Sequence, residues 1–235
     1  MLKYRHLFFD LDNTLYDFEA NSYLALEQVF TELKLIEKLP SFAEYFKVYD
    51  KVNHDLWALY REKKMAKDVL RGKRHKDSLA AFSIIPEISP LEIDDKYLKT
   101  MTTQTELFPG TIDMLVHLKN KGYQMHIITN GFKEVQHDKM VNTGLSNFFN
   151  NVFISEEIKS PKPSREIFEH AIKSSNARKK ESIMIGDSWE SDIVGAKNFG
   201  IDQVYFNLFD EKIDVEKYGE ATYTISKLNE LYDIF

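Results

Sequence analysis

The sequence has no cysteine, so it can form neither a disulfide framework nor a thiolate metal site. It also lacks an apolar run long enough to span a bilayer, and the apolar stretch behind the basic residues Lys3 and Arg5 is too short for a signal peptide. An excess of positive charge is absent as well, because the net charge is −6. The chain therefore has no general attraction to nucleic acid or anionic lipid. We expect a cytoplasmic protein with neither of these partners.

The chain is apolar enough for a packed core, since 43% of its 235 residues are hydrophobic. From residue 107 onward, predicted strands and helices alternate. The strands fall at 125–128, 152–154, 182–185 and 203–206, and the helices at 111–121, 132–143, 164–174 and 189–199. This alternation predicts βαβ units and a parallel sheet, which is an α/β fold.

Residues 17–106 interrupt this alternation, because they contain helical patterns and no evident strand. The helices are expected at 19–33, 41–59, 66–82 and 94–103, with a turn through Pro86 and Pro90 before the last one. Pro109-Gly110 marks the return to the alternating pattern. We therefore predict a core domain made of residues 1–16 and 107–235, with residues 17–106 inserted as a helical domain.

Two carboxylates follow the first predicted strand, the apolar run Leu7 to Phe9. Asp10 and Asp12 are two residues apart, so their side chains can converge on one point beyond the strand end. Two anions this close repel each other, unless a cation or a shared proton relieves both. A helix cap or a turn is the structural alternative for this pair. The pattern favours a binding or catalytic site.

Polar residues also follow three later strands of the predicted sheet. They are Thr129, Asn130 and Gly131 after one strand, Lys162 between two prolines in a loop, and Asp187 with Asp192 after another strand. In an open α/β sheet, ligands bind beyond the carboxyl ends of the strands. We therefore expect these residues to meet Asp10 and Asp12.

This set of residues suits metal-assisted phosphoryl transfer. Carboxylates are ligands for Mg²⁺, which typically also binds water and substrate phosphate. Lys162, Thr129, Asn130 and the backbone amides near Gly131 suit phosphate oxygens. Asp10 is then the expected nucleophile, and Asp12 is placed to donate a proton to the leaving oxygen and later to accept one from water.

The motifs occur in the order Asp10-Leu-Asp12-Asn-Thr14, Thr129-Asn130, Ser-Pro-Lys162-Pro and Gly186-Asp187-Ser-Trp-Glu-Ser-Asp192. With them the chain resembles the haloacid dehalogenase-like (HAD) superfamily phosphatases that carry a helical type-1 cap. The resemblance implies a Rossmann-like, doubly wound core and a cap at residues 17–106. It also implies a Mg²⁺ ion bound by Asp10, Asp187 and the backbone carbonyl of Asp12, with Asp192 as an auxiliary acid. The acid at Asp12 favours phosphatases over dehalogenases, which lack it.

A finer resemblance connects the chain to the bacterial pyrimidine 5′-nucleotidases. It rests on Val52-Asn53 with Leu56-Trp57 and Tyr60, on Thr129-Asn130-Gly131-Phe132, on Thr143-Gly144-Leu145 and on Ile154-Ser155-Glu156-Glu157. It implies nucleoside 5′-monophosphates as substrates. Phe18, Trp57 and Tyr60 are the candidate pocket residues, although packing within the protein would explain these aromatic side chains equally well.

Three other functions are compatible with the sequence. The same machinery could hydrolyse sugar phosphates or other small organic phosphates, or the fold could serve as a catalytically silent binding protein. A nucleic-acid binder would rest on the basic run Lys63, Lys64, Lys67, Arg71, Lys73, Arg74 and Lys76. We interpret that run as a solvated helix face, because the chain is acidic overall and the run lacks interleaved aromatics.

Overall fold

The computed structural model describes residues 3–235, which form two compact units. One unit extends up to Phe18 and continues over Thr105–Phe235, and the other covers Glu19–Gln104. The domain boundaries expected from the sequence, after residues 16 and 106, lie two residues away from these limits. Within the described residues no helix has the length and apolar character needed to cross a membrane.

The first unit, the core, is built on a six-stranded sheet in which every paired strand runs parallel, in the order β3-β2-β1-β4-β5-β6. The strands are β1 (His6–Phe9), β2 (Gln124–Thr129), β3 (Asn151–Ile154), β4 (Ser182–Gly186), β5 (Asp202–Phe206) and β6 (Tyr223–Ile225). β1 lies between β2 and β4, and Phe9 is in register with Ile127 and Ile185. The predicted α/β fold with a parallel sheet is therefore confirmed.

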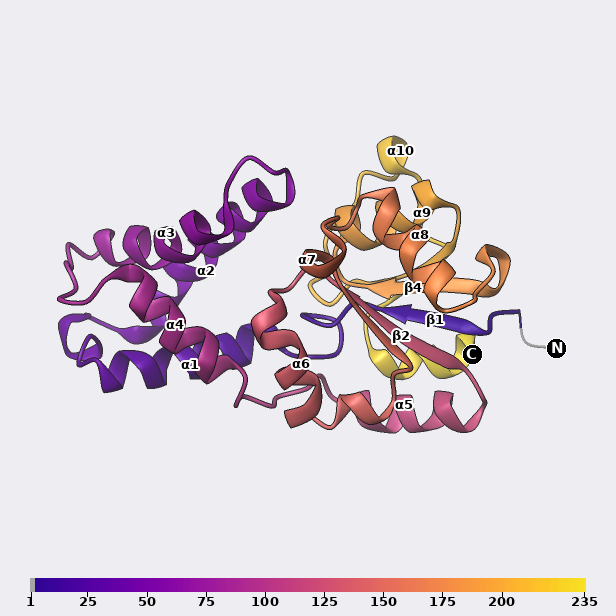
Figure 1. The fold of residues 1–235 in the computed structure, drawn as a ribbon, viewed down its shortest axis with the longest axis horizontal. Helices are drawn as coiled ribbons and strands as arrows, with labels where there is room; N and C mark the ends of the chain where they lie inside the picture. Colours follow the sequence, from indigo (N-terminus) through magenta and orange to yellow (C-terminus); the bar gives the residue numbers. More distant parts are fainter. Residues whose placement is uncertain (1–2) are drawn as a thin grey trace. The chain divides into compact units, whose positions relative to one another are not determined.

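Helices cover both faces of this sheet, as expected for strands that are buried on both sides. They are α5 (Thr111–Asn120), α6 (Lys133–Asn142), α7 (Ser155–Ile158), α8 (Arg165–Ser174), α9 (Gly195–Phe199), α10 (Val215–Tyr218) and α11 (Leu231–Ile234). α8 and α9 lie on one face and α5 on the other (Figure 1). On the first face Phe168 and Phe199 pack with Phe8 and Ile128 of the sheet. The strands thus rest on a buried apolar layer.

The second unit, the helical unit, contains the helices expected from the sequence, with shifted ends. They are α1 (Phe18–Glu32), α2 (Phe42–Arg61), α3 (Lys67–Ala80) and α4 (Pro90–Met101), with a short 3₁₀ turn at Ile36–Lys38. The prediction of a turn at Pro90 is wrong, because α4 begins there. Ser89 and Glu92 form a capping box, and Pro90 occupies the first turn, where a missing N–H costs no hydrogen bond.

The interior of the helical unit holds buried ions. Arg74 is 1% exposed and Asp94 is fully buried. Asp94 accepts from Arg74 Nε at 2.7 Å and from Arg71 Nε at 2.6 Å, and its Oδ1 lies 3.0 Å from His75 Nε2. The interpretation of the basic run as a solvated face is therefore wrong for Arg71 and Arg74, because Asp94, far along the sequence, draws them inward.

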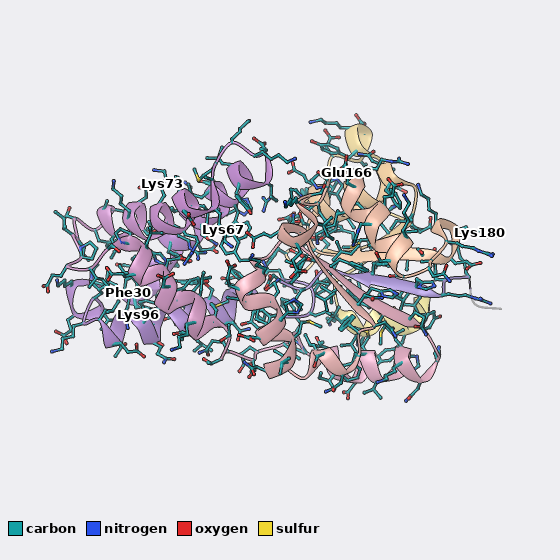
Figure 2. The ribbon with its side chains drawn as sticks, viewed as in Figure 1. Phe30, Lys67, Lys73, Lys96, Glu166 and Lys180 are labelled. Carbon is teal, nitrogen blue, oxygen red and sulfur yellow. The ribbon has the colours of Figure 1, made fainter. Side chains whose placement is uncertain are left out.

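Other members of the basic run do face solvent. Lys73 and Lys76 on α3 are exposed, as are Lys63 and Lys64 before it. Figure 2 draws the side chains on the ribbon, with Lys67 and Lys73 labelled on α3. The run is thus divided between a solvated set of lysines and two arginines, of which Arg74 is buried and Arg71 is partly buried.

A pair of histidines lies where β1 and β2 run side by side. His6 Nδ1 is 3.2 Å from His126 Nε2, and the two rings stack with centroids 5.4 Å apart. His126 Nδ1 also lies 3.0 Å from Asn151 Nδ2 and 3.3 Å from Ser175 Oγ. His126 is 2% exposed, so it is a buried, hydrogen-bonded side chain.

The core chain leaves β1 and returns before α5 along two adjacent segments. Tyr16 and Leu107 form an isolated antiparallel bridge. Asp17 N donates to Glu106 O at 3.1 Å, and Phe108 N donates to Leu15 O at 3.0 Å. These backbone contacts, which we call the neck, close the core at the point where the helical unit is inserted.

Candidate active site

Lys162 connects the acidic side chains at the centre of the site. Its Nζ donates to Asp10 Oδ1 at 2.6 Å and to Ile128 O at 2.6 Å, and it lies 2.7 Å from Asp192 Oδ1. The lysine is 2% exposed, and burial alone would lower its pKa. Asp10 and Asp192 more than offset that effect, so the pKa of Lys162 is raised and the ammonium form persists.

Among the described residues, one group of three or more acidic, histidine or cysteine side chains is close enough together to hold a metal ion, and it consists of three carboxylates. One oxygen from each of Asp10, Asp187 and Asp192 lies within 4.8 Å of the others. Burial raises the pKa of Asp10 to about 7, with Asp192 acting in the same direction and Lys162 against it. Burial also raises the pKa of Asp187 well above its usual range, and Asp10 and Asp192 add to that shift. If all three carboxylates were ionised around the one ammonium group, two negative charges would lack a partner, and this repulsion adds to burial in raising the two pKa values.

Asp187 is held by a threonine of the first motif. Thr14 Oγ1 donates to Asp187 Oδ1 at 3.0 Å and accepts from Asp187 N at 3.1 Å. Thr14 is fully buried, and it follows Asn13, whose φ of 62° lies in the left-handed region that asparagine tolerates. The turn after β1 thus contacts the end of β4 and fixes the position of Asp187, the residue that follows this strand.

Asp192 lies in a π-helical turn over Trp189–Val194, which forms the first part of the helix predicted over 189–199. Its Oδ2 accepts from Ser188 N at 3.1 Å. A Cβ on Gly186 would lie 2.2 Å from Asp192 Oδ2, so only glycine at the end of β4 leaves room for this carboxylate. A wider turn of this kind is frequent at functional sites.

Asn130 holds the loop that carries Lys162. Its Nδ2 donates to Lys162 O at 2.9 Å, and its Oδ1 accepts from Lys162 N at 2.8 Å. The Asn130 side chain, expected to contact phosphate, is therefore engaged by the lysine backbone. This two-point contact fixes the loop from which the ammonium group reaches Asp10.

The Thr129 hydroxyl oxygen accepts two hydrogen bonds. Gly131 N donates to it at 3.0 Å, and Gln136 Nε2 donates to it at 2.7 Å. The Gly131 amide, expected to be free for an anion, is thus occupied within the protein. α6 begins after it, at Lys133.

Asp12 contacts two residues that the sequence analysis did not identify. Its Oδ1 accepts from Lys139 Nζ at 2.7 Å, and its Oδ2 accepts from Gln136 Nε2 at 2.9 Å. Both donors lie on the buried face of α6, three residues apart. Polar residues at this spacing among apolar ones were a signal that could have been used.

The candidate pocket residues lie in different units. Phe18 is half-buried in the core, with Lys139 Nζ 5.3 Å from its ring centroid. Trp57 and Tyr60 lie on α2 in the helical unit, with ring centroids 5.4 Å apart in an edge-to-face arrangement. Each of these contacts lies within a single unit.

Comparisons of the sequence and of the structure with known proteins point to the same family. The model of the haloacid dehalogenase-like hydrolases matches residues 7–206. The HAD-hydrolase YfnB of Bacillus subtilis is 31% identical over all of this chain and 96% of that protein. A crystal structure of YfnB bound to magnesium has a TM-score of 0.87 at 29% identity, covering 99% of this chain and 98% of YfnB.

Phosphatases of different substrates are among the relatives with a named activity. The pyrimidine 5′-nucleotidase PynA of Streptococcus pneumoniae is 30% identical over 98% of this chain and 94% of that protein. The glyceraldehyde 3-phosphate phosphatase of Methanothermobacter thermautotrophicus is 28% identical over 97% of this chain and 98% of its own length.

Proposed function

Because the chain belongs to the haloacid dehalogenase-like hydrolase family, we propose that it is a Mg²⁺-dependent phosphatase of small phosphate monoesters. The observation that carries the proposal is the group of Asp10, Asp187 and Asp192 around Lys162. In this proposal Asp10 is the nucleophile, and Asp12 is the general acid and base. Nucleoside 5′-monophosphates are the proposed substrates.

The acidic group fits a divalent cation. Its carboxylates are hard oxygen ligands, and one Mg²⁺ ion would balance the two negative charges that the fully ionised group carries beyond Lys162. Asp10, Asp187 and the backbone carbonyl of Asp12 would hold the ion, and Asp192 would hold Lys162 beside it. When bound, the ion would neutralise phosphate oxygens and the repulsion among the carboxylates.

The first step transfers the phosphoryl group to Asp10. Lys162 donates to Oδ1 of Asp10, so the other carboxylate oxygen is available to attack phosphorus. A new oxygen–phosphorus bond forms at Asp10 while the bond from phosphorus to the leaving oxygen breaks. Asp12 gives its proton to that oxygen, which departs as an alcohol.

The second step returns Asp10 to its free form. Asp12, now ionised, accepts a proton from a water molecule whose oxygen attacks phosphorus. The bond between phosphorus and Asp10 breaks, and inorganic phosphate is released. Lys162, which lies 2.6 Å from Asp10, stabilises negative charge on the transferred group, and the Thr129 hydroxyl contacts it.

Two substrate classes have support among the relatives. PynA is named as a pyrimidine 5′-nucleotidase, and this chain also shares with that branch the segments quoted above, which favours nucleoside monophosphates. The glyceraldehyde 3-phosphate phosphatase supports the alternative of sugar or other small organic phosphates. Phe18, Trp57 and Tyr60 are our candidates for contacts with the leaving group.

The test is phosphate release with Mg²⁺ from a panel of nucleoside monophosphates and sugar phosphates. We expect Asp10→Asn to lower kcat by at least about a thousandfold, as loss of a nucleophile does. Asp113→Asn, an exposed carboxylate in the first turn of α5, is the matched control and should leave kcat unchanged.

Each result has a distinct meaning. A preference for pyrimidine monophosphates supports the nucleotidase, whereas a preference for sugar phosphates keeps the mechanism and replaces the substrate. Turnover that survives in Asp10→Asn, or is absent from the wild type, contradicts the proposed phosphatase and leaves a binding protein.

A further inference from the structure

α6 places two polar side chains inside the core. Gln136 is fully buried and Lys139 is 2% exposed, although both are long side chains that usually reach solvent. Gln136 Oε1 is buried and has no hydrogen-bond partner among the described residues. Keeping such a group inside without a partner is costly. A residue retained at this cost points to a role other than packing.

The two side chains fix both oxygens of Asp12. Lys139 Nζ binds Oδ1 at 2.7 Å, and Gln136 Nε2 binds Oδ2 at 2.9 Å. A single contact would let the carboxylate rotate about its bond to Cβ. Two contacts from fixed points on one helix set the plane of the carboxylate as well as its position.

Gln136 also orients a second residue of the site. The same Nε2 donates to Thr129 Oγ1 at 2.7 Å, and Gly131 N donates to that oxygen at 3.0 Å. Because Oγ1 accepts two hydrogen bonds, its lone pairs are occupied, and its own O–H must point elsewhere as a donor. Gln136 thereby connects the expected proton donor with the expected phosphate contact.

The space around both side chains is matched to them. A Cβ on Gly131 would lie 2.2 Å from Gln136 Nε2, so a larger residue at 131 would displace the amide. Lys139 Nζ lies 4.6 Å from the ring centroid of Tyr16 and 5.3 Å from that of Phe18. The rings confine the ammonium group and face it with their negative π surfaces.

We propose that Gln136 and Lys139 are positioning residues, which hold Asp12 in line with the leaving oxygen. This inference rests on the proposed phosphatase function. Lys139 acts on Asp12 alone, whereas Gln136 acts on Asp12 and on Thr129. The two residues should therefore have distinguishable effects on catalysis.

The test uses the leaving group as the readout. Uridine 5′-monophosphate and ribose 5-phosphate release alkoxides that need a proton, whereas p-nitrophenyl phosphate releases a phenolate that leaves without one. kcat/KM reports the reaction up to phosphoryl transfer to Asp10, before the second step. Loss of a well-placed proton donor should lower kcat/KM only for the alkyl esters.

For Lys139→Met and Gln136→Met we expect kcat/KM on the alkyl esters to fall about tenfold to a hundredfold. On p-nitrophenyl phosphate, Lys139→Met should change kcat/KM by less than about threefold. Gln136→Met should also weaken inhibition by inorganic phosphate, because the Thr129 hydroxyl loses its orientation, whereas Lys139→Met should not.

Three further variants separate positioning from folding. Lys139→Arg keeps the cation and should recover most of the activity on alkyl esters. Gln136→Glu keeps the size of the side chain but removes its N–H donors, and should behave as Gln136→Met does. Lys133→Met, an exposed lysine on the same helix, is the control and should match the wild type on every ester.

Equal losses on alkyl and aryl esters in Lys139→Met would overturn its positioning role, as would the absence of any loss in either variant, while Asp10-dependent turnover persists. Absence of Asp10-dependent turnover from the wild type on all three esters would overturn both the proposed function and this inference.

Discussion

Two buried ion clusters, one in each unit, have opposite compositions. In the core, the carboxylates of Asp10, Asp187 and Asp192 surround one ammonium group, that of Lys162. In the helical unit, Arg71, Arg74 and His75 surround one carboxylate, that of Asp94. Each cluster has a fully buried carboxylate, Asp192 in the core and Asp94 in the helical unit, and an uncompensated charge at such a place is costly.

The difference lies in whether the charges balance. Burial opposes ionisation of Asp94, but Arg74, His75 and Arg71 more than offset it and lower its pKa to about 2. Arg71 also pairs with Asp95, and burial lowers the pKa of His75, so two arginines face two carboxylates. In the core, burial instead raises the pKa of Asp10 to about 7. A buried cluster whose charges balance can serve folding alone, whereas a buried cluster with excess negative charge predicts a bound cation.

The largest effect is expected for Asp94→Asn. Removing this charge leaves Arg74 buried without its partner, and loss of one member of a buried pair costs about 3–5 kcal/mol. Asp95→Asn is the control, since the Asp95 side chain is 70% exposed and should contribute less than about 1 kcal/mol. A cost below about 1 kcal/mol for Asp94→Asn would contradict the structural role of its cluster.

The two tryptophans allow each unit to be followed by itself. Trp57 lies in the helical unit and Trp189 in the core. Urea unfolding of Trp189→Phe reports the helical unit through Trp57 fluorescence, and that of Trp57→Phe reports the core. Asp94→Asn should lower the midpoint reported by Trp57 more than the midpoint reported by Trp189.

The next effect concerns the unbalanced cluster. Mg²⁺ at a hundred times its dissociation constant should stabilise the wild-type core by about 2.7 kcal/mol. Asp187→Asn should lose most of this gain. In EDTA the same variant should be at least as stable as the wild type, because it removes a repelling charge and keeps the acceptor for Thr14. Destabilisation of the metal-free variant by more than about 1 kcal/mol would argue against charge imbalance. Urea unfolding of each protein with and without Mg²⁺ is the measurement.

The smallest effect concerns the pair of His6 and His126. Unlike the two ion clusters, this pair carries no charge at neutral pH. Burial, with His6 beside it, lowers the pKa of His126 to about 4. The unfolded chain, with a histidine pKa near the ordinary 6.5, binds the proton first, so stability falls as pH drops from about 6.5 toward 4. Between pH 7 and pH 5 this loss is about 2 kcal/mol. His126→Gln should reduce the pH dependence by that amount in urea unfolding at both pH values. An unchanged pH dependence would show that His126 is not responsible.

Most of the core could be predicted from the sequence, because its strands and helices have clear apolar patterns bounded by glycine. β6 was missed, since Tyr223–Ile225 is too short to show alternation. The π-helical turn was missed because it depends on how Asp192 bonds to Ser188 and Lys162, not on apolar spacing. The apolar pattern of a sequence predicts where a helix lies better than it predicts whether the helix is of the α or the π type.

The motif residues at the strand ends could be found because parallel strands bring their carboxyl ends to one edge. Gln136 and Lys139 were missed, since their spacing beside Val135 and Met140 is only a weak sign that a glutamine and a lysine face inward. Arg74 was misinterpreted for the same reason, because its partner Asp94 is distant in the sequence. Buried polar contacts between segments that are distant in the sequence could not be predicted from it.

The neck between Tyr16 and Leu107 has a consequence for biosynthesis. β1 is translated first, yet its sheet neighbours begin only at Gln124 and Ser182. The helical unit is therefore complete in the growing chain before either neighbour exists. Once this unit is folded, the two chain segments at the neck are adjacent and are no longer joined by a long flexible loop. The entropy that β1 must lose to join the sheet is then smaller. We therefore expect the insertion to help the nascent core to close.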